Sequence, residues 1–184
     1  MTARLGGERG TTIIEVVIAS AILVTLMAGL MSLGGLAIST TENQGHLAAR
    51  TTEYAQDKME QLLALTFGDT TSDTRSFPAA NSGGSGLAPG GSSDTSAPVA
   101  LYVDYLDEDG NLCATGNTHC GPPSGVTPPT GWFYQRVWRV DDTTTDATLP
   151  ANLKRITVSS TIARGFGGAM KASSTLSVLK SNPF

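Results

Sequence analysis

The N-terminal part of the chain contains its longest apolar stretch. From Val16 to Ile38, 23 consecutive residues carry no charged side chain. As an α-helix this stretch would rise about 34 Å, and the hydrocarbon core of a bilayer is about 30 Å thick. The pattern therefore predicts one membrane-spanning helix.

The following segment has the pattern of an amphipathic helix. Apolar or small side chains recur every three or four residues, and charged side chains occupy most of the other positions. Because Gly is a common helix end, we expect one helix from about Thr12 to Phe67 that stops at Gly68. Its core-facing residues are expected to be Leu47, Thr51, Tyr54, Ala55, Met59, Leu62 and Thr66.

Turn-forming residues dominate after the helix. Residues 68–98 are rich in Gly, Ser, Pro and Thr, which predicts a long surface loop. A contact loop and a plain connection both fit this composition. Beyond it, four segments have the alternation or the β-branched and aromatic content of strands. They cover 101–106, 132–140, 156–162 and 176–178, with a turn at 165–168 before the last strand.

These elements predict an α+β fold, in which an antiparallel sheet of about four strands packs on the amphipathic half of one long N-terminal helix. Five segments follow one another: a leader, the apolar helix half, the amphipathic helix half, the loop and the sheet part of a globular domain. Their boundaries are 1–10, 11–39, 40–67, 68–98 and 99–184.

One carboxylate, that of Glu15, lies at the start of the apolar stretch. An acidic side chain in a bilayer core costs roughly 2.5 to 3.5 kcal/mol on insertion scales, so its presence needs a specific reason. A cleaved secretory signal does not fit, because the small residues 19–21 precede most of the apolar run instead of following it. An uncleaved signal anchor explains the apolar run, but it explains neither Glu15 nor Gly10.

Gly10 and Glu15 carry a resemblance to a known family. The sequence GTTIIEVVIASAIL resembles the N-terminal signature of type IV pilins and of type II secretion pseudopilins. In that family a prepilin peptidase cuts after Gly, and Glu is the fifth residue of the mature chain. The resemblance implies cleavage between Gly10 and Thr11 and N-methylation of the new amine, although Thr11 stands where the family usually has Phe.

The resemblance also implies a role for Glu15 in assembly. Cleavage would place the Thr11 amine at the depth of the Glu15 carboxylate of a neighbouring helix displaced by about one turn, so that two buried charges are paired. Arg4 and Arg9 precede the span, and no other Lys or Arg occurs before Arg50. The positive-inside rule therefore predicts a cytoplasmic N-terminus and a periplasmic globular domain, anchored in the inner membrane by a single pass.

A second motif makes the resemblance more specific, because it points to minor subunits of this family. The run AQDKMEQLLAL, from Ala55 to Leu65, is similar to the same region of minor pilins of the pilus-modification type and of minor pseudopilins. It implies a structural minor subunit of a type IV pilus that assists pilus assembly, adhesion or motility. The alternatives are a minor pseudopilin of a type II secretion system and a single-span receptor with a periplasmic domain. The implied partners are other pilin subunits, the prepilin peptidase and an inner-membrane assembly platform.

The chain contains two cysteines, Cys113 and Cys120, which by the orientation above lie outside the cytoplasm. We therefore expect a disulfide, which would close a short loop and contribute about 2 to 3 kcal/mol. A metal site needs more ligands than these residues and His119 supply, and a redox pair more often reads Cys-x-x-Cys.

Asp107, Asp109 and Asn111 resemble the start of a calcium loop, because they place oxygen ligands at alternate positions. However, Gly110 is fourth instead of sixth, and Thr118 stands where the twelfth-position Glu would be. Asp-Gly also favours a hairpin turn. The turn is the favoured interpretation, and calcium stays a second one.

Charge and composition argue against other functions. The formal net charge of −4 becomes −5 when the leader, with two Arg and one Glu, is removed, so nucleic-acid binding has no electrostatic support. No catalytic set of side chains is evident, so we expect no enzyme and no cofactor. Arg136 and Arg139 lie among aromatic residues that would form a stacking patch if exposed, although aromatic strand residues are usually core.

Overall fold

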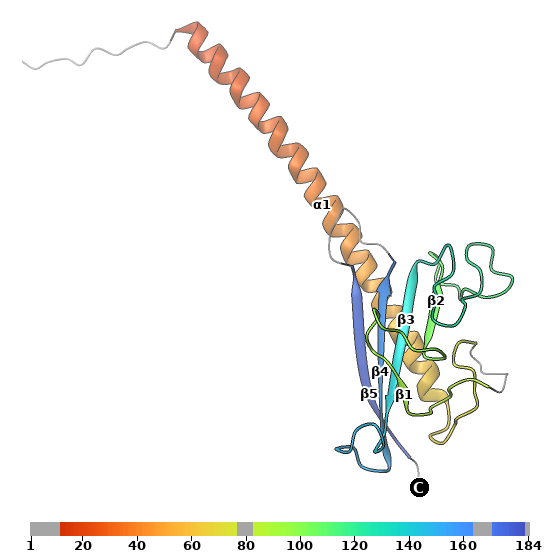
Figure 1. Ribbon diagram of the computed structural model, residues 1–184. Coiled ribbons are helices and arrows are strands. Elements are labelled where there is room, and N and C mark those ends of the chain that lie inside the picture. Colours follow the sequence, from red (N-terminus) through yellow and green to blue (C-terminus); the bar gives the residue numbers. More distant parts are fainter. Residues whose placement is uncertain (1–11, 77–82, 164–170, 183–184) are drawn as a thin grey trace, which may run out of the picture. The chain divides into compact units, whose positions relative to one another are not determined.

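The computed structural model describes residues 12–76, 83–163 and 171–182. The chain divides into two compact units between Glu42 and Asn43, and one α-helix runs through this boundary. The described residues form this helix and five β-strands (Figure 1). The elements are α1 (Ile13–Ala64), β1 (Gly90–Gly91), β2 (Val103–Leu106), β3 (Tyr134–Asp141), β4 (Leu153–Ile162) and β5 (Ser173–Ser181).

The five strands form one antiparallel sheet. β3 pairs with β4, and β4 pairs with β5. The other edge of β3 is shared by two short strands, because β1 pairs with its C-terminal end and β2 with its N-terminal half. The predicted α+β fold is confirmed, with five strands instead of about four. The additional strand, β1, consists of two Gly residues and has no strand pattern in the sequence.

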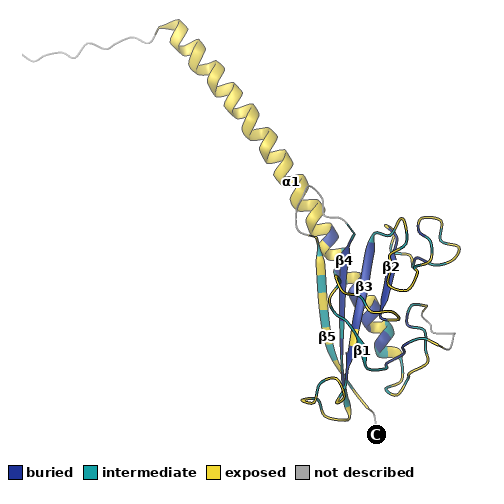
Figure 2. Ribbon diagram, viewed as in Figure 1, coloured by how far each residue is buried: buried dark blue, intermediate teal, exposed yellow. Residues whose placement is uncertain are grey.

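The second half of α1 contributes one face to the core of the domain (Figure 2). Its buried residues include all of the predicted set except Thr66, which lies beyond the helix end and is exposed. Lys58 is buried as well, and the sequence pattern did not predict this. The buried helix residues are Leu47, Thr51, Tyr54, Ala55, Lys58, Met59 and Leu62.

The two faces of the sheet have different coverings. On one face, helix residues such as Met59 and Leu62 pack with Trp138 and Ile156, which are fully buried. A separate cluster contains the disulfide cysteines together with Val103, Tyr105 and Val137. Because side chains alternate along a strand, this second cluster belongs to the face away from the helix.

Helix α1 ends at Ala64, three residues before the predicted end at Phe67. Lys180 of β5 donates to the carbonyls of Leu63 and Leu65, so a strand side chain satisfies groups that a further helical turn would otherwise bind. The predicted turn at 165–168 lies outside the described residues.

Candidate functional site

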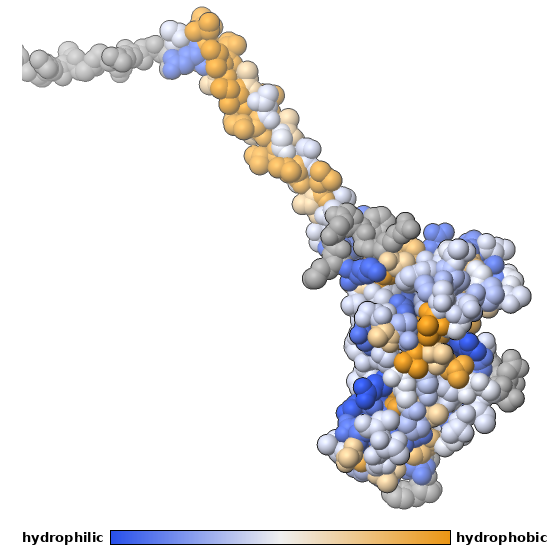
Figure 3. All heavy atoms as spheres, in the orientation of Figure 1, coloured by the Kyte–Doolittle hydropathy of each residue, from blue (hydrophilic) through white to orange (hydrophobic). Residues whose placement is uncertain are grey.

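The first half of α1 is an exposed apolar helix. Every described residue from 12 to 46 is exposed, with Ile13 at 85% and Met31 at 77%. Figure 3 shows this apolar surface along the helix. The segment is long and apolar enough to cross a membrane. A helix that is apolar on all sides is stable only where lipid or other apolar helices cover it.

Hydroxyl side chains in this apolar segment donate hydrogen bonds to backbone carbonyls of the same helix. Ser20 Oγ donates to the Val16 carbonyl at 2.7 Å, and Thr25 Oγ1 donates to the Ile22 carbonyl at 2.8 Å. Ser39, Thr40 and Thr41 make similar contacts. Such internal hydrogen bonds make hydroxyl side chains compatible with hydrocarbon.

Glu15 lies in the first turn of α1 and is the one ionisable residue from position 12 to position 41. A carboxylate only accepts hydrogen bonds, so the helix carbonyls that satisfy these hydroxyl groups cannot satisfy it. Gly10 and Thr11, between which cleavage is predicted, lie outside the described residues. Cleavage, methylation and the pairing of Glu15 therefore stay predictions.

The predicted disulfide between Cys113 and Cys120 is confirmed. Both residues are buried, and the loop between them is folded around Asn117. The Asn117 Oδ1 accepts hydrogen bonds from the His119 N–H at 2.7 Å and from the Cys120 N–H at 3.2 Å. The disulfide therefore holds this compact loop against the sheet face that points away from the helix.

The Asp107 carboxylate organises the turn that precedes the disulfide loop. It accepts hydrogen bonds from the backbone N–H groups of Asp109 and Asn111 and from the Asn111 and Asn117 amides. Burial raises the pKa of Asp107, but these hydrogen bonds outweigh it and hold the pKa below the usual value. Gly110 has φ of 88°, and a Cβ there would lie 2.4 Å from the Tyr54 hydroxyl.

This geometry is that of a turn. The Asn111 amide nitrogen donates to the Asp107 carboxylate. The residue whose side chain lies near both carboxylates is His119, with its Nδ1 3.5 Å from Asp109 Oδ2 and 3.8 Å from Asp107 Oδ2. Asp107, Asp109 and His119 form the one described group of ligand-type side chains close enough to share a metal ion. The calcium set of the sequence, with Asn111, stays an untested prediction.

A buried ion cluster joins the second half of α1 to the sheet. Asp104 of β2 accepts from Lys58 Nζ at 2.7 Å and from Arg136 Nε at 2.7 Å. Arg136 also donates to Asp57 at 2.7 Å. Lys58 donates further to the Thr74 carbonyl. The side chains of Lys58, Asp104 and Arg136 are at most 4% exposed.

Burial dominates the electrostatics of this cluster. It lowers the pKa of Lys58 to about 8, against the attraction of Asp104. Burial also raises the pKa of Asp104, but Arg136 and Lys58 outweigh it, and the net shift is downward. Lys58 and Arg136 thus both depend on the Asp104 carboxylate for compensation. Removal of one member of such a cluster leaves an uncompensated buried charge. Here the cluster links α1 to β2 and β3.

Arg136 and the aromatic residues do not form the stacking patch that their spacing suggested. Tyr134 and Trp138 are buried in the core, and Arg136 is held in the ion cluster. Arg139 binds Asp141 Oδ1 at 2.6 Å on the opposite sheet face. The two arginines are three residues apart on β3, so the alternation of side chains along a strand places them on opposite faces of the sheet.

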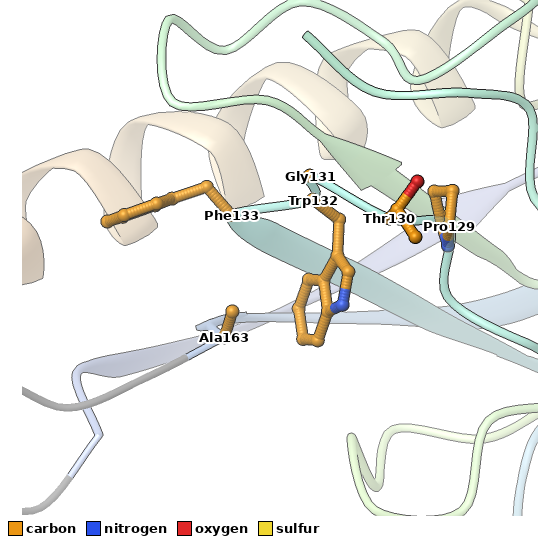
Figure 4. A pocket seen from close by; sticks show the side chains of 6 residues that line it. All are labelled: Pro129, Thr130, Gly131, Trp132, Phe133 and Ala163. Carbon is orange, nitrogen blue, oxygen red and sulfur yellow. The ribbon is translucent and has the colours of Figure 1, made fainter.

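Trp132 and Phe133 instead line a hollow of about 580 Å³ at the start of β3 (Figure 4). Its lining is mostly apolar and consists of Pro129, Thr130, Gly131, Trp132, Phe133 and Ala163. The Trp132 ring packs edge-on against Tyr105, with ring centroids 5.4 Å apart. The Phe133 N–H donates to the Leu106 carbonyl at 2.8 Å. These contacts give the hollow a fixed floor.

Comparisons with known proteins add no identity. Models of protein families, curated proteins and solved structures were searched, and none matches the chain. The function is therefore inferred from the residues and from their geometry.

Proposed function

We propose that this protein is a filament subunit of the type IV pilin class, made with a leader, anchored in the inner membrane and then packed into a filament through the first half of α1. The observation that supports this most strongly is the fully exposed apolar helix with a single carboxylate, Glu15, in its first turn. A plain membrane anchor would need the apolar residues but no charge.

Lipid and a bundle of parallel helices are the two environments that could cover the apolar half of α1. Lipid covers apolar side chains equally on all sides, but it gives Glu15 no counter-charge. A bundle of parallel helices covers the same side chains and also brings N-termini close together. With a leader removed after Gly10, each neighbour would offer the Thr11 amine to Glu15. The bundle is therefore the environment that accounts for both features.

In this proposal the protein is a minor subunit that assists assembly, adhesion or motility of a pilus, with other pilin subunits as neighbours. The leader would be removed by a prepilin peptidase, and an assembly platform in the inner membrane would extract the mature chain. A short secretion filament of the type II kind uses the same residues. Deletion of the gene distinguishes the two machines, since one loses pili and the other loses protein export.

Substitution of Glu15 tests the proposal directly. In Glu15→Leu the apolar helix remains, so we expect normal membrane insertion. Breaking a buried charge pair costs about 3 to 5 kcal/mol, so we expect incorporation into filaments to fall roughly 100-fold or more. The amounts of the protein in sheared filaments and in membranes are measured by immunoblot.

The matched control is Glu42→Leu, which removes the next acidic residue along α1, just beyond the apolar half. We expect this variant to enter filaments at the wild-type level. Equal incorporation of Glu15→Leu and wild type would overturn the proposal, as would an equal loss in both variants.

A further inference from the structure

Strand β5 forms one edge of the sheet (Figure 1). It pairs with β4 over its whole length, from Ser173 to Ser181, and in the part of the chain that the structure describes no strand pairs with its other side. The opposite side of the sheet is different, because the strands beside β3 there are only two and four residues long. The outer edge of β5 is therefore the long edge of the sheet.

The backbone groups of β5 point alternately toward β4 and toward the outer edge. The Ile162 N–H donates to the Ala172 carbonyl at 3.3 Å, and the Asn182 N–H donates to the Asn152 carbonyl at 2.8 Å. Because hydrogen-bonded pairs alternate along an antiparallel ladder, the even-numbered residues of β5 direct their N–H and C=O groups at β4. The odd-numbered residues direct theirs outward, and the same residues are exposed (Figure 2). They are Ser173, Thr175, Ser177, Leu179 and Ser181.

β5 lacks the features that usually keep an edge strand from pairing with another chain. Such features are Pro, a charged side chain on the edge or a bulge. β5 contains no Pro, and its register with β4 is unbroken. Its one charged residue is Lys180, which is bound to the carbonyls of Leu63 and Leu65 at the end of α1. The outer edge is therefore open to an extended chain.

A hollow of about 360 Å³ lies beside β5, between this strand and α1, and is called the helix–strand hollow below. Met59, Leu176 and Val178 belong to the main core cluster and give it an apolar floor. Glu60 is exposed at its helix side. Every second side chain of a strand added to β5 would point to the helix side of the sheet, where this hollow lies. Its lining consists of Gln56, Met59, Glu60, Leu176, Ser177 and Val178.

We propose that the outer edge of β5 binds an extended segment of a different protein chain, which adds to the sheet as a further strand. The row of outward N–H and C=O groups selects an extended backbone. The helix–strand hollow selects the side chains, with an apolar one over Met59 and a basic one beside Glu60. A second copy would bring its own Glu60 and no free basic residue on β5, because Lys180 is bound to α1. Binding of such a segment does not require the protein to be a filament subunit.

The test uses the full-length protein in detergent and a fluorescent nine-residue peptide, as long as β5, in which Val alternates with Thr and Arg replaces one Val. Binding is measured by fluorescence anisotropy. The control peptide has the same side chains but carries N-methyl groups on alternate residues, so it cannot form the ladder. We expect the control to bind about tenfold more weakly, since several hydrogen bonds are lost. Equal binding of the two peptides, or no binding at about 1 mM peptide, would overturn the inference.

Two variants of Ser177 test the same edge from the side of the protein. The Ser177 N–H points outward, so Ser177→Pro removes a donor that faces the partner and leaves the ladder with β4 intact. We expect an unchanged melting temperature and an affinity for the peptide that falls about tenfold. Ser177→Ala also loses the hydroxyl contact with Thr157 but keeps the N–H, and should bind as wild type does. Normal binding by a folded Ser177→Pro variant would contradict the proposal.

Glu60 tests the choice of side chains. Glu60→Gln should weaken binding of the Arg peptide about threefold, because an exposed ion pair contributes little, and should leave binding of an all-Val version unchanged. An equal effect on both peptides would remove the basic residue from the proposed partner.

Hydrogen exchange measured by NMR distinguishes an added strand from an apolar ligand in the helix–strand hollow. The peptide should slow exchange at the outward N–H groups of Thr175, Ser177 and Leu179. Exchange at Leu176 and Val178 should change little, because their N–H groups already bind β4. Binding without protection of the outward groups would exclude an added strand. Sedimentation of the protein alone tests the other occupant, since a dimer that Ser177→Pro abolishes would assign the edge to a second copy and overturn the inference.

Discussion

Residues 13–42 and residues 43–64 belong to one continuous helix, but the two segments differ in how far their side chains are buried. The first segment has no buried residue, whereas the second buries seven, including a lysine. The first is nearly free of charge and the second is rich in it. The comparison shows that the globular domain of the same chain covers one face of the second segment, while every residue of the first segment is exposed.

The two segments also differ in whether a charged side chain has a counter-charge in the same domain. Lys58 in the second segment finds its counter-charge, Asp104, within its own chain. Glu15 in the first segment lies among exposed apolar residues. In the proposed function, a charge that is compensated inside the domain governs folding, and one that needs a neighbour governs assembly. The predictions below test this division, from the largest expected effect to the smallest.

Asp104→Asn removes the carboxylate that Lys58 and Arg136 share. We expect the free energy of unfolding to fall by about 3 to 5 kcal/mol, because two buried cations lose their compensation. It is measured by denaturant unfolding of the full chain in detergent. Asp57→Asn, whose carboxylate is 54% exposed, should cost less than about 1 kcal/mol. Equal costs for the two variants would refute the role of burial.

Leucine truncation in the two helix segments gives a matched pair. Leu62 is fully buried, so Leu62→Ala should lower the free energy of unfolding by about 2 to 4 kcal/mol. Leu23 is 56% exposed, and Leu23→Ala should change it by less than about 0.5 kcal/mol. The same denaturation assay applies. A comparable loss in Leu23→Ala would mean that the domain covers the first segment after all.

Raising the pH should stabilise the domain through Lys58. Its pKa of about 8 in the folded protein lies below the ordinary 10.5, so between these values the unfolded chain binds a proton that the folded chain has released. Stability therefore rises with pH, by about 2 kcal/mol from pH 8 to pH 10. Wild type is compared with Lys58→Met over this range, where their difference should grow. Parallel curves would contradict the assignment.

Removal of the β5 lysine that binds carbonyls at the end of α1 should have the smallest effect. Lys180→Met leaves the Leu63 and Leu65 carbonyls without their donor and should cost about 1 kcal/mol. Hydrogen exchange at the last turn of the helix should quicken. Lys171→Met, at an exposed residue, is the control and should change neither quantity.

The apolar pattern was sufficient to predict the helix and most of its buried face. Met59 and Leu62 recur at helical spacing with Tyr54 and Ala55, so one stripe toward the core follows from the sequence. Lys58 lies next to this stripe, but lysine is ordinarily exposed. Its burial depends on Asp104, which is remote in the sequence and meets it only in the folded domain.

The candidate sites were predictable to different degrees. The disulfide followed from two cysteines at short spacing in a chain expected outside the cytoplasm. The outer edge of β5 was not predictable, because a strand pattern does not indicate which strands lie beside it in the sheet. Residues that depend on distant partners leave no local signal.

The N-terminus of the mature protein tests the central claim most directly. The intact mass and N-terminal sequence are determined for protein recovered from membranes, with and without an active prepilin peptidase. We predict a chain that begins at Thr11 only when the peptidase is active, and methylation would appear as one additional methyl group. Retention of residues 1–10 in both samples would contradict the filament-subunit proposal and favour a membrane-anchored receptor.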